Sequence, residues 1–223
     1  MKQFVIIVAG GSGSRMGVKT PKQFLEIASK PILMHTIEKF LAFSATLQII
    51  LVLPSKQMQA WHKLCEKHDF YPPIITADGG KTRFQSVKSG LKKIKTTEGI
   101  VAVHDGVRPF VSLEIIANGF ETAAKHGSAV TAIKLKDSLR KVSKTGKSKA
   151  VDRSDYRLIQ TPQTFDLATI KVAFEAEEQD FYTDCASVME HAGHGITLIE
   201  GAYENIKITT PEDLLWAEVL IRK

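Results

Sequence analysis

The chain lacks the features that mark secreted, membrane-spanning and thiolate-metal proteins. It has only two cysteines among 223 residues, Cys65 and Cys185, which are far apart and lack metal-type spacing. We expect both to be buried or unreactive thiols in a reducing cytoplasm. No apolar run is long enough to cross a bilayer, and the start, MKQFVIIVAGG, lacks the apolar stretch and cleavage site of a signal peptide. These absences predict a soluble, cytoplasmic protein with no membrane partner.

The chain also has no basic block interleaved with aromatic residues. Its 30 Lys and Arg residues exceed its 24 Asp and Glu residues, for a formal net charge of +6, but they are spread along the chain. Spread positive charge favours small polyanionic substrates over nucleic acid, although much of it can be solvated surface. Hydrophobic residues make up 43%, which is average for a globular chain, and the length predicts a single domain over residues 1–223.

Two familiar phosphate-binding motifs are missing from the glycine-rich segment VAGGSGSRMG, residues 8–17. The residues after Gly17 are VKT, not the Gly-Lys-Ser/Thr of a Walker A loop, and Met16 stands where the dinucleotide fingerprint needs its third glycine. The second absence disfavours a dinucleotide oxidoreductase. What is present is a loop whose backbone N–H groups can face phosphate oxygens.

Two cations accompany this loop. Arg15 lies inside it and Lys22 follows in the segment TPKQF. Cations held near a phosphate-binding loop suit a reaction that builds negative charge on phosphorus. The alternative interpretation is a tight turn with two surface cations.

Two further segments could contribute to a site. HDGVRP follows an apolar run and places Asp105 where it could hold Mg²⁺, with Arg108 able to pair with Asp105 or with a phosphate. The alternative is a buried Asp–Arg pair that closes a turn. In GGKTRFQS, two glycines precede a helix and would let a flat base approach the backbone, while Arg83 and Ser86 offer polar contacts. Alone, that segment is only a turn before a helix.

Apolar runs alternate with amphipathic stretches through the first 133 residues. Strands are expected at 4–8, 49–53, 74–76, 100–103 and 129–133, separated by helices that include ones beginning near Ser55 and Ser112. This rhythm predicts an α/β fold with a parallel or mixed sheet and helices on both faces. Ligands bind such sheets at the carboxyl ends of the strands, where the glycine-rich segment and HDGVRP fall.

The rhythm breaks at residues 134–157, which are polar, rich in lysine, and carry a turn at Thr145-Gly146. We expect a protruding β-arm, and the alternative is a disordered surface loop. Helical segments are expected to resume after Pro162. A capping box from Thr210 to Asp213, with proline at the first helical position, predicts the start of the last helix.

In chain order, VAGGSGSRMG, PKQF, GGKTRFQSV, VHDGVRPF, the DR of the arm, TPQTF, TDCAS and ENIKITTPEDL resemble the 2-C-methyl-D-erythritol 4-phosphate cytidylyltransferase family. The resemblance covers nearly the whole chain. It implies an α/β, Rossmann-like nucleotidyltransferase fold, Mg²⁺-dependent transfer of a cytidylyl group from CTP to a polyol phosphate, and a homodimer in which the arm reaches the neighbouring subunit. Val8 and the GV of HDGVRP depart from the family's commoner residues, at positions where only backbone or spacing matters.

The resemblance also implies individual roles. Arg15 and Lys22 would stabilise the transition state at the α-phosphorus, and Asp105 would bind Mg²⁺. The acceptor phosphate would be held by Arg153 and Lys207, with Thr183 and Ser138 as further candidates, and Arg153 would serve the partner's site. The residues expected to cradle the nucleotide are Ala9, Gly10, Gly11, Gly13, Gly79, Gly80, Arg83 and Ser86.

Other functions stay open at this point. A ribitol 5-phosphate cytidylyltransferase shares most of these motifs, although TDCASVMEHAG and DRSDYRLIQTPQTF look nearer to the methylerythritol branch. A non-catalytic nucleotide-binding regulator could use the same fold. The sequence offers no Ser-His or Cys-His pair, and a phosphate acceptor needs none, because its oxygen is already a nucleophile at neutral pH.

Overall fold

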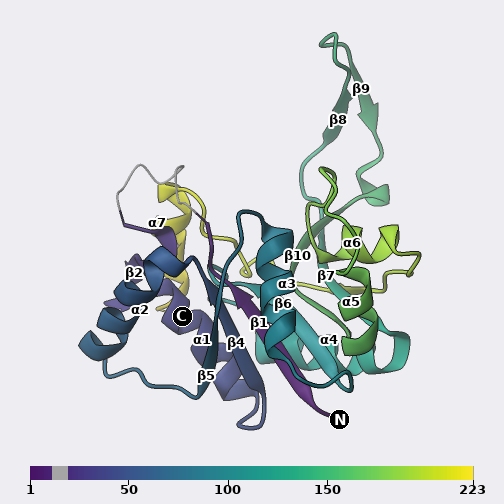
Figure 1. Cartoon of the computed structure of the whole chain (residues 1–223). Helices are drawn as coiled ribbons and strands as arrows, with labels where there is room; N and C mark the ends of the chain where they lie inside the picture. Colours follow the sequence, from purple (N-terminus) through teal and green to yellow (C-terminus); the bar gives the residue numbers. More distant parts are fainter. Residues whose placement is uncertain (12–19, 223) are drawn as a thin grey trace.

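A seven-stranded sheet forms the centre of the molecule (Figure 1). In the computed structural model, residues 1–11 and 20–222 are described. The strand order is β11-β7-β10-β6-β1-β4-β5, and only β10 runs antiparallel to its neighbours. The strands are β1 (Gln3–Val8), β4 (Gln48–Leu53), β5 (Ile74–Asp78), β6 (Ile100–Asp105), β7 (Ser128–Lys134), β10 (Arg157–Asp166) and β11 (Leu198–Glu200).

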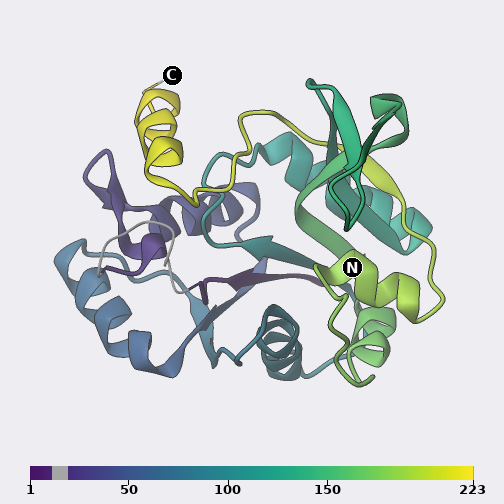
Figure 2. The same ribbon diagram turned by 90° about the horizontal axis from the view of Figure 1, so that it is seen from above.

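Helices cover both faces of this sheet, as the alternating sequence pattern predicts. They are α1 (Ile32–Phe43), α2 (Ser55–Lys67), α3 (Arg83–Lys93), α4 (Leu113–His126), α5 (Leu167–Ala173), α6 (Cys185–His191) and α7 (Pro211–Leu220). Seen from above, α3 lies on one side of the sheet and α1 and α4 lie on the other (Figure 2). None of the helices in the described part of the chain is long and apolar enough to span a membrane.

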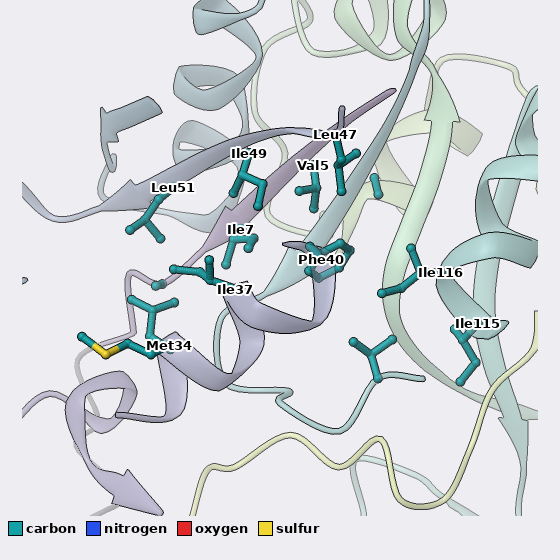
Figure 3. Close-up of a cluster of buried hydrophobic side chains, with 14 of the residues drawn as sticks. Val5, Ile7, Met34, Ile37, Phe40, Leu47, Ile49, Leu51, Ile115 and Ile116 are labelled. Atoms are coloured by element: carbon teal, nitrogen blue, oxygen red, sulfur yellow. The ribbon is translucent and has the colours of Figure 1, made fainter. Parts of the chain in front are cut away.

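The strands are buried because their apolar side chains alternate between two cores. Val5 and Ile7 of β1 point toward α1, where Figure 3 shows them near Ile37 and Phe40. Ile6, between them in sequence, packs on the opposite face with residues of α3, α5 and α6. The central strands are therefore fixed from both sides, and their carboxyl ends form a rigid edge.

The helices expected near Ser55, Ser112 and Thr210 are confirmed, and two of them have the side-chain caps that the sequence suggests. The Ser112 hydroxyl accepts the N–H of Ile115, and Thr210 with Asp213 forms the predicted capping box. The suggestion that Ser55 caps its helix was wrong. Ser55 is the first residue of α2, and Pro54 precedes it without any side-chain cap.

Strand β10 was not predicted, because its buried residues are polar. Helical segments were expected after Pro162, yet the strand continues to Asp166 and lies between β6 and β7. Its pairing with β7 shifts between Ile159 and Gln163, around the proline, which cannot donate to the ladder. The buried polar side chains make specific hydrogen bonds instead of apolar contacts, so neither periodicity nor hydrophobicity marks the strand.

A separate hairpin forms within residues 134–157. Strands β8 (Leu139–Val142) and β9 (Ser148–Val151) pair antiparallel with each other and not with the main sheet. The turn contains Gly146 at a φ of 80°, a conformation that favours glycine. Figure 1 shows the hairpin extending away from the sheet. At its base the Tyr203 hydroxyl donates to the Lys134 carbonyl, and the Lys136 ammonium lies over the Tyr203 ring.

Candidate active site

A polar cavity of about 400 Å³ opens at the carboxyl ends of β1 and β6. The two strands end together, because Val8 and Asp105 are paired in register and Gly106 donates its N–H to the Val8 carbonyl. Most of the residues predicted for nucleotide binding and catalysis line this cavity. They are Ala9, Gly10, Gly11, Lys22, Gly80, Arg83 and Ser86, and the predicted metal residue Asp105 and acceptor residue Lys207 line it as well. Gly13 and Arg15 lie outside the described residues.

The glycines make room for close approaches. A Cβ on Gly11 would lie 3.1 Å from the Cε of Lys22, so glycine lets that lysine lie against the loop. A Cβ on Gly80 would lie 2.2 Å from the Cβ of Gln85, which rules out a side chain there. Gly80 donates its N–H to the Ser86 hydroxyl. Gly79 is hydrogen-bonded to the Leu53 carbonyl and is not among the cavity-lining residues.

Lys22 is held by the segment around it. It begins the short 3-10 helix η2 (Lys22–Phe24) directly after Pro21 and is only 8% exposed. The neighbouring Gln23 donates to the Ala9 carbonyl at 2.7 Å and to Gln57 of α2 at 2.6 Å. Phe24 stacks on buried Trp61. These contacts fix the lysine beside the end of β1 before any ligand binds.

Three cations surround the Asp105 carboxylate. Lys207 Nζ lies 3.0 Å and Arg108 Nε 3.3 Å from Oδ2, while Arg83 Nε lies 3.8 Å from Oδ1. Burial alone would raise the pKa of Asp105, but Arg83, Lys207 and Arg108 together lower it well below its usual range. Asp105 is therefore ionised at neutral pH. Of the two interpretations of Arg108, the structure shows the ion pair with Asp105.

His104 is an uncharged imidazole that supports the cluster of cations around Asp105. Its Nε2 lies 3.1 Å from the Arg108 carbonyl and its Nδ1 3.2 Å from the Thr161 hydroxyl. That hydroxyl accepts the N–H of Asp105, so its proton points to Nδ1 and the imidazole proton sits on Nε2. Burial lowers the pKa of His104 to about 4. The imidazole is a fully buried structural group and cannot reach a ligand.

A second cavity of about 240 Å³ adjoins the first. Arg83, Asp105 and Lys207 line both. Two predicted acceptor residues, Arg108 and Thr183, line the second cavity and not the first. Its remaining lining residues include Gln160, Thr161, Gln163 and Asp184. Sequence reasoning missed the β10 members of this set, for which the polar run QTPQT was the only available signal.

The hairpin residues predicted to bind the acceptor do not line these cavities in their own chain. Arg153 lies in the 3-10 helix η3 (Arg153–Asp155), is exposed, and donates to the Lys136 carbonyl. Ser138 is exposed beside β8. Neither residue lines the two cavities. A role for them in a neighbouring subunit stays a prediction.

The residues present fit a magnesium ion held mainly by substrate. No cluster of three His, Cys, Asp or Glu residues occurs in the described part of the chain. Mg²⁺ in nucleotide sites usually takes one or two carboxylates and the substrate phosphates. Asp105 supplies one ionised carboxylate on the cavity wall, and Arg83 Nε lies 3.8 Å from its Oδ1, beyond hydrogen-bond range.

A mixed, mostly parallel sheet with a cation-lined cavity at its carboxyl edge defines the class of α/β proteins that bind phosphate-bearing ligands there. Solved structures of that architecture superpose on the whole chain. The 4-diphosphocytidyl-2C-methyl-D-erythritol synthase of Anaerococcus prevotii does so with a TM-score of 0.85 and 29% identity, covering 100% of this chain and 96% of the other. The 2-C-methyl-D-erythritol 4-phosphate cytidylyltransferase of Thermus thermophilus gives 0.79 and 29%, with both chains fully covered. The predicted Rossmann-like nucleotidyltransferase fold is confirmed.

Sequence comparisons give the family. The family model for 2-C-methyl-D-erythritol 4-phosphate cytidylyltransferase matches residues 3–223. Proteins of that name from Bacteroides thetaiotaomicron and Phocaeicola vulgatus are 50% and 51% identical to this chain over 221 residues, covering 99% of it and 100% of each relative. The chain belongs to the 2-C-methyl-D-erythritol 4-phosphate cytidylyltransferase family.

Proposed function

We propose that this protein transfers a cytidylyl group from CTP to 2-C-methyl-D-erythritol 4-phosphate and releases pyrophosphate, a step of the non-mevalonate isoprenoid pathway. The observation that carries the proposal is Lys22 and the Asp105 cluster lining one cavity at the ends of β1 and β6, in a chain of this family. The cavity takes the nucleotide. The second cavity, which shares Arg83, Asp105 and Lys207 with it, takes the acceptor phosphate.

The reaction needs positioning and charge neutralisation rather than a base. An oxygen of the acceptor phosphate attacks the α-phosphorus of CTP as the bond from that phosphorus to the bridging oxygen breaks, and pyrophosphate leaves with the bonding electrons. No proton has to move. The two reactants are anions that repel each other, and charge builds on the α-phosphoryl oxygens in the transition state.

Lys22, together with Arg15 of the glycine-rich segment, stabilises the negative charge that builds on the α-phosphoryl group. Preorganised cations cost no rearrangement at the moment of reaction, and the contacts of Gln23 and Phe24 support that placement of Lys22. Lys207 and Arg108 hold the acceptor phosphate beside Asp105. The backbone of Gly10, Gly11 and Gly80 cradles the nucleotide.

Magnesium is the cofactor that this arrangement suits, and it would neutralise phosphate charge when bound with CTP. Asp105 would hold it. The same proposal includes a homodimer in which the hairpin carries Arg153 and Ser138 to the acceptor cavity of the other subunit. Its support is that both residues are exposed and do not line the cavities of their own chain.

The test is pyrophosphate release from CTP and Mg²⁺, with methylerythritol 4-phosphate and ribitol 5-phosphate as parallel acceptors. We expect fast release with the first acceptor alone. Release with ribitol 5-phosphate alone would reassign the acceptor. CTP binding without release from either acceptor would favour the regulator. Sedimentation of the purified protein across a concentration range tests the dimer.

A further inference from the structure

Arg83 stands in the wall that the two cavities share. It begins α3 and lines both cavities. Its Nε faces Asp105 at 3.8 Å, and its Nη1 donates to the Cys185 sulfur at 3.1 Å. Its Nη2 is buried and has no hydrogen-bond partner among the described residues. A buried guanidinium nitrogen without a partner is costly, so the site is complete only when an acceptor oxygen reaches it.

The position of Cys185 is fixed from strand β10. Cys185 is the first residue of α6 and is fully buried. The Gln163 side-chain oxygen accepts the N–H groups of Cys185 and Ala186, and its nitrogen donates to Asp184. Asp184 also forms a capping box with Ser187. The thiol is therefore held against Arg83 by a helix start whose backbone is fixed by the Gln163 and Asp184 side chains.

The thiol orients the guanidinium without neutralising it. Burial raises the pKa of the Cys185 thiol, and the nearby Arg83 charge lowers it by less, so the group stays protonated at neutral pH. Sulfur is a weak acceptor, and an acidic side chain at this place would cancel the Arg83 charge. A neutral acceptor leaves that charge available to the phosphates on either side.

We propose that Cys185 is a positioning residue for the transfer reaction: it holds Arg83 between the two cavities so that the Nη2 group donates to phosphate oxygens of the bound substrates. The inference rests on the proposed function. It assigns Cys185 a role that its burial alone would not suggest, because the thiol touches no cavity and acts only through Arg83.

The experiment compares Cys185→Ala, Cys185→Ser, Arg83→Ala and the double variant Cys185→Ala/Arg83→Ala. Each is assayed for pyrophosphate release, CTP affinity by calorimetry, and urea unfolding. Cys65→Ala is the matched control, because Cys65 is the other cysteine of the chain, is also buried, and lies on α2.

Loss of a hydrogen bond to a charged group should lower kcat/KM about tenfold in Cys185→Ala. Cys185→Ser should recover most of this loss, since its hydroxyl can accept from Arg83. In the Arg83→Ala background, Cys185→Ala should cause no further loss, because the two residues act as one unit. Cys65→Ala should change only the unfolding midpoint.

Two results would overturn the inference while leaving the function standing. One is a wild-type rate in Cys185→Ala. The other is a full tenfold loss from Cys185→Ala in the Arg83→Ala background, which would mean that the thiol acts elsewhere. If Cys185→Ala does not fold, Cys185→Val, which fills similar space without an acceptor, replaces it; a loss of kcat/KM relative to Cys185→Ser is expected, and equal kcat/KM in stably folded Cys185→Val and Cys185→Ser would overturn the inference. A silent wild type would instead overturn the proposed function.

Discussion

The nucleotide cavity and the hairpin contrast in how their charges are held. In the cavity, Lys22 and Asp105 are less than a tenth exposed and are fixed by neighbouring contacts. In the hairpin, Arg153 is exposed, and the strands on either side of the turn bury no residue completely. The nucleotide cavity is held in place by contacts within its own chain, whereas the hairpin has no buried core to hold it.

This contrast indicates what each region contributes to folding and to function. A two-stranded hairpin alone is only marginally stable in water, so the exposed hairpin contributes little to folding. Its conformation here depends on its own pairing and on the Tyr203 contacts at its base. We therefore expect substitutions in the cavity to lower activity and stability strongly. Substitutions in the hairpin should mainly weaken binding to the molecules that the hairpin contacts.

Lys22→Ala should have the largest effect. Removing a preorganised contact to the developing charge typically costs about 100-fold or more in kcat, or about 3 kcal/mol in the barrier. Steady-state kinetics of pyrophosphate release would measure this, with exposed Lys56→Ala as the control. An unchanged kcat with a raised KM for CTP would instead make Lys22 a ground-state binding residue.

Acid should destabilise the cavity through His104. In the folded chain its pKa is lowered from 6.5 to about 4, so between these values the unfolded state binds a proton that the folded state does not. The free energy of unfolding should therefore fall as the pH falls from about 6.5 to about 4, by about 3 kcal/mol in total. Urea unfolding across this range measures the slope, and His104→Gln should flatten it. An equal slope in both proteins would assign the loss to other groups.

Arg153→Ala should weaken acceptor use while sparing the nucleotide. One charged contact to a phosphate contributes about 2 kcal/mol, which predicts an acceptor KM raised by about thirtyfold. Arg140→Ala is the matched control, because Arg140 is also a hairpin arginine and bonds Ser148 within the hairpin. If the two variants respond alike to acceptor concentration, Arg153 has no place in the site.

Val142→Ser should have the smallest effect and tests the contrast most directly. Val142 is 63% exposed in β8, so the free energy of unfolding should change by less than about 0.5 kcal/mol. Val103→Ala in buried β6 should cost about 2 kcal/mol through lost burial and a residual cavity. Thermal unfolding of both variants gives the comparison. A large decrease in the free energy of unfolding of Val142→Ser would show that the hairpin is covered in solution.

The parts predictable from sequence are those with local signals. The apolar runs predicted five strands, and the turn at Thr145-Gly146 predicted the hairpin. Strand β10 and the residues that it contributes to the second cavity escaped prediction, because buried glutamines and threonines look like loop residues until their partners are known. The Arg83–Cys185 contact joins residues 102 positions apart, and no local pattern encodes such a pair. The pairing of Asp105 with Arg108 was one of two predicted alternatives, and the structure decides between them.

The crowding of three cations around one carboxylate also has a thermodynamic consequence for the ligand-free chain. Arg83, Arg108 and Lys207 carry more positive charge than Asp105 and the nearby Asp184 balance, and their mutual repulsion opposes folding. Any polyanion that binds there relieves this repulsion and stabilises the folded state by mass action. The melting temperature of the protein should thus be higher in phosphate than in chloride at equal ionic strength, and substrate would act as a folding ligand as well as a reactant.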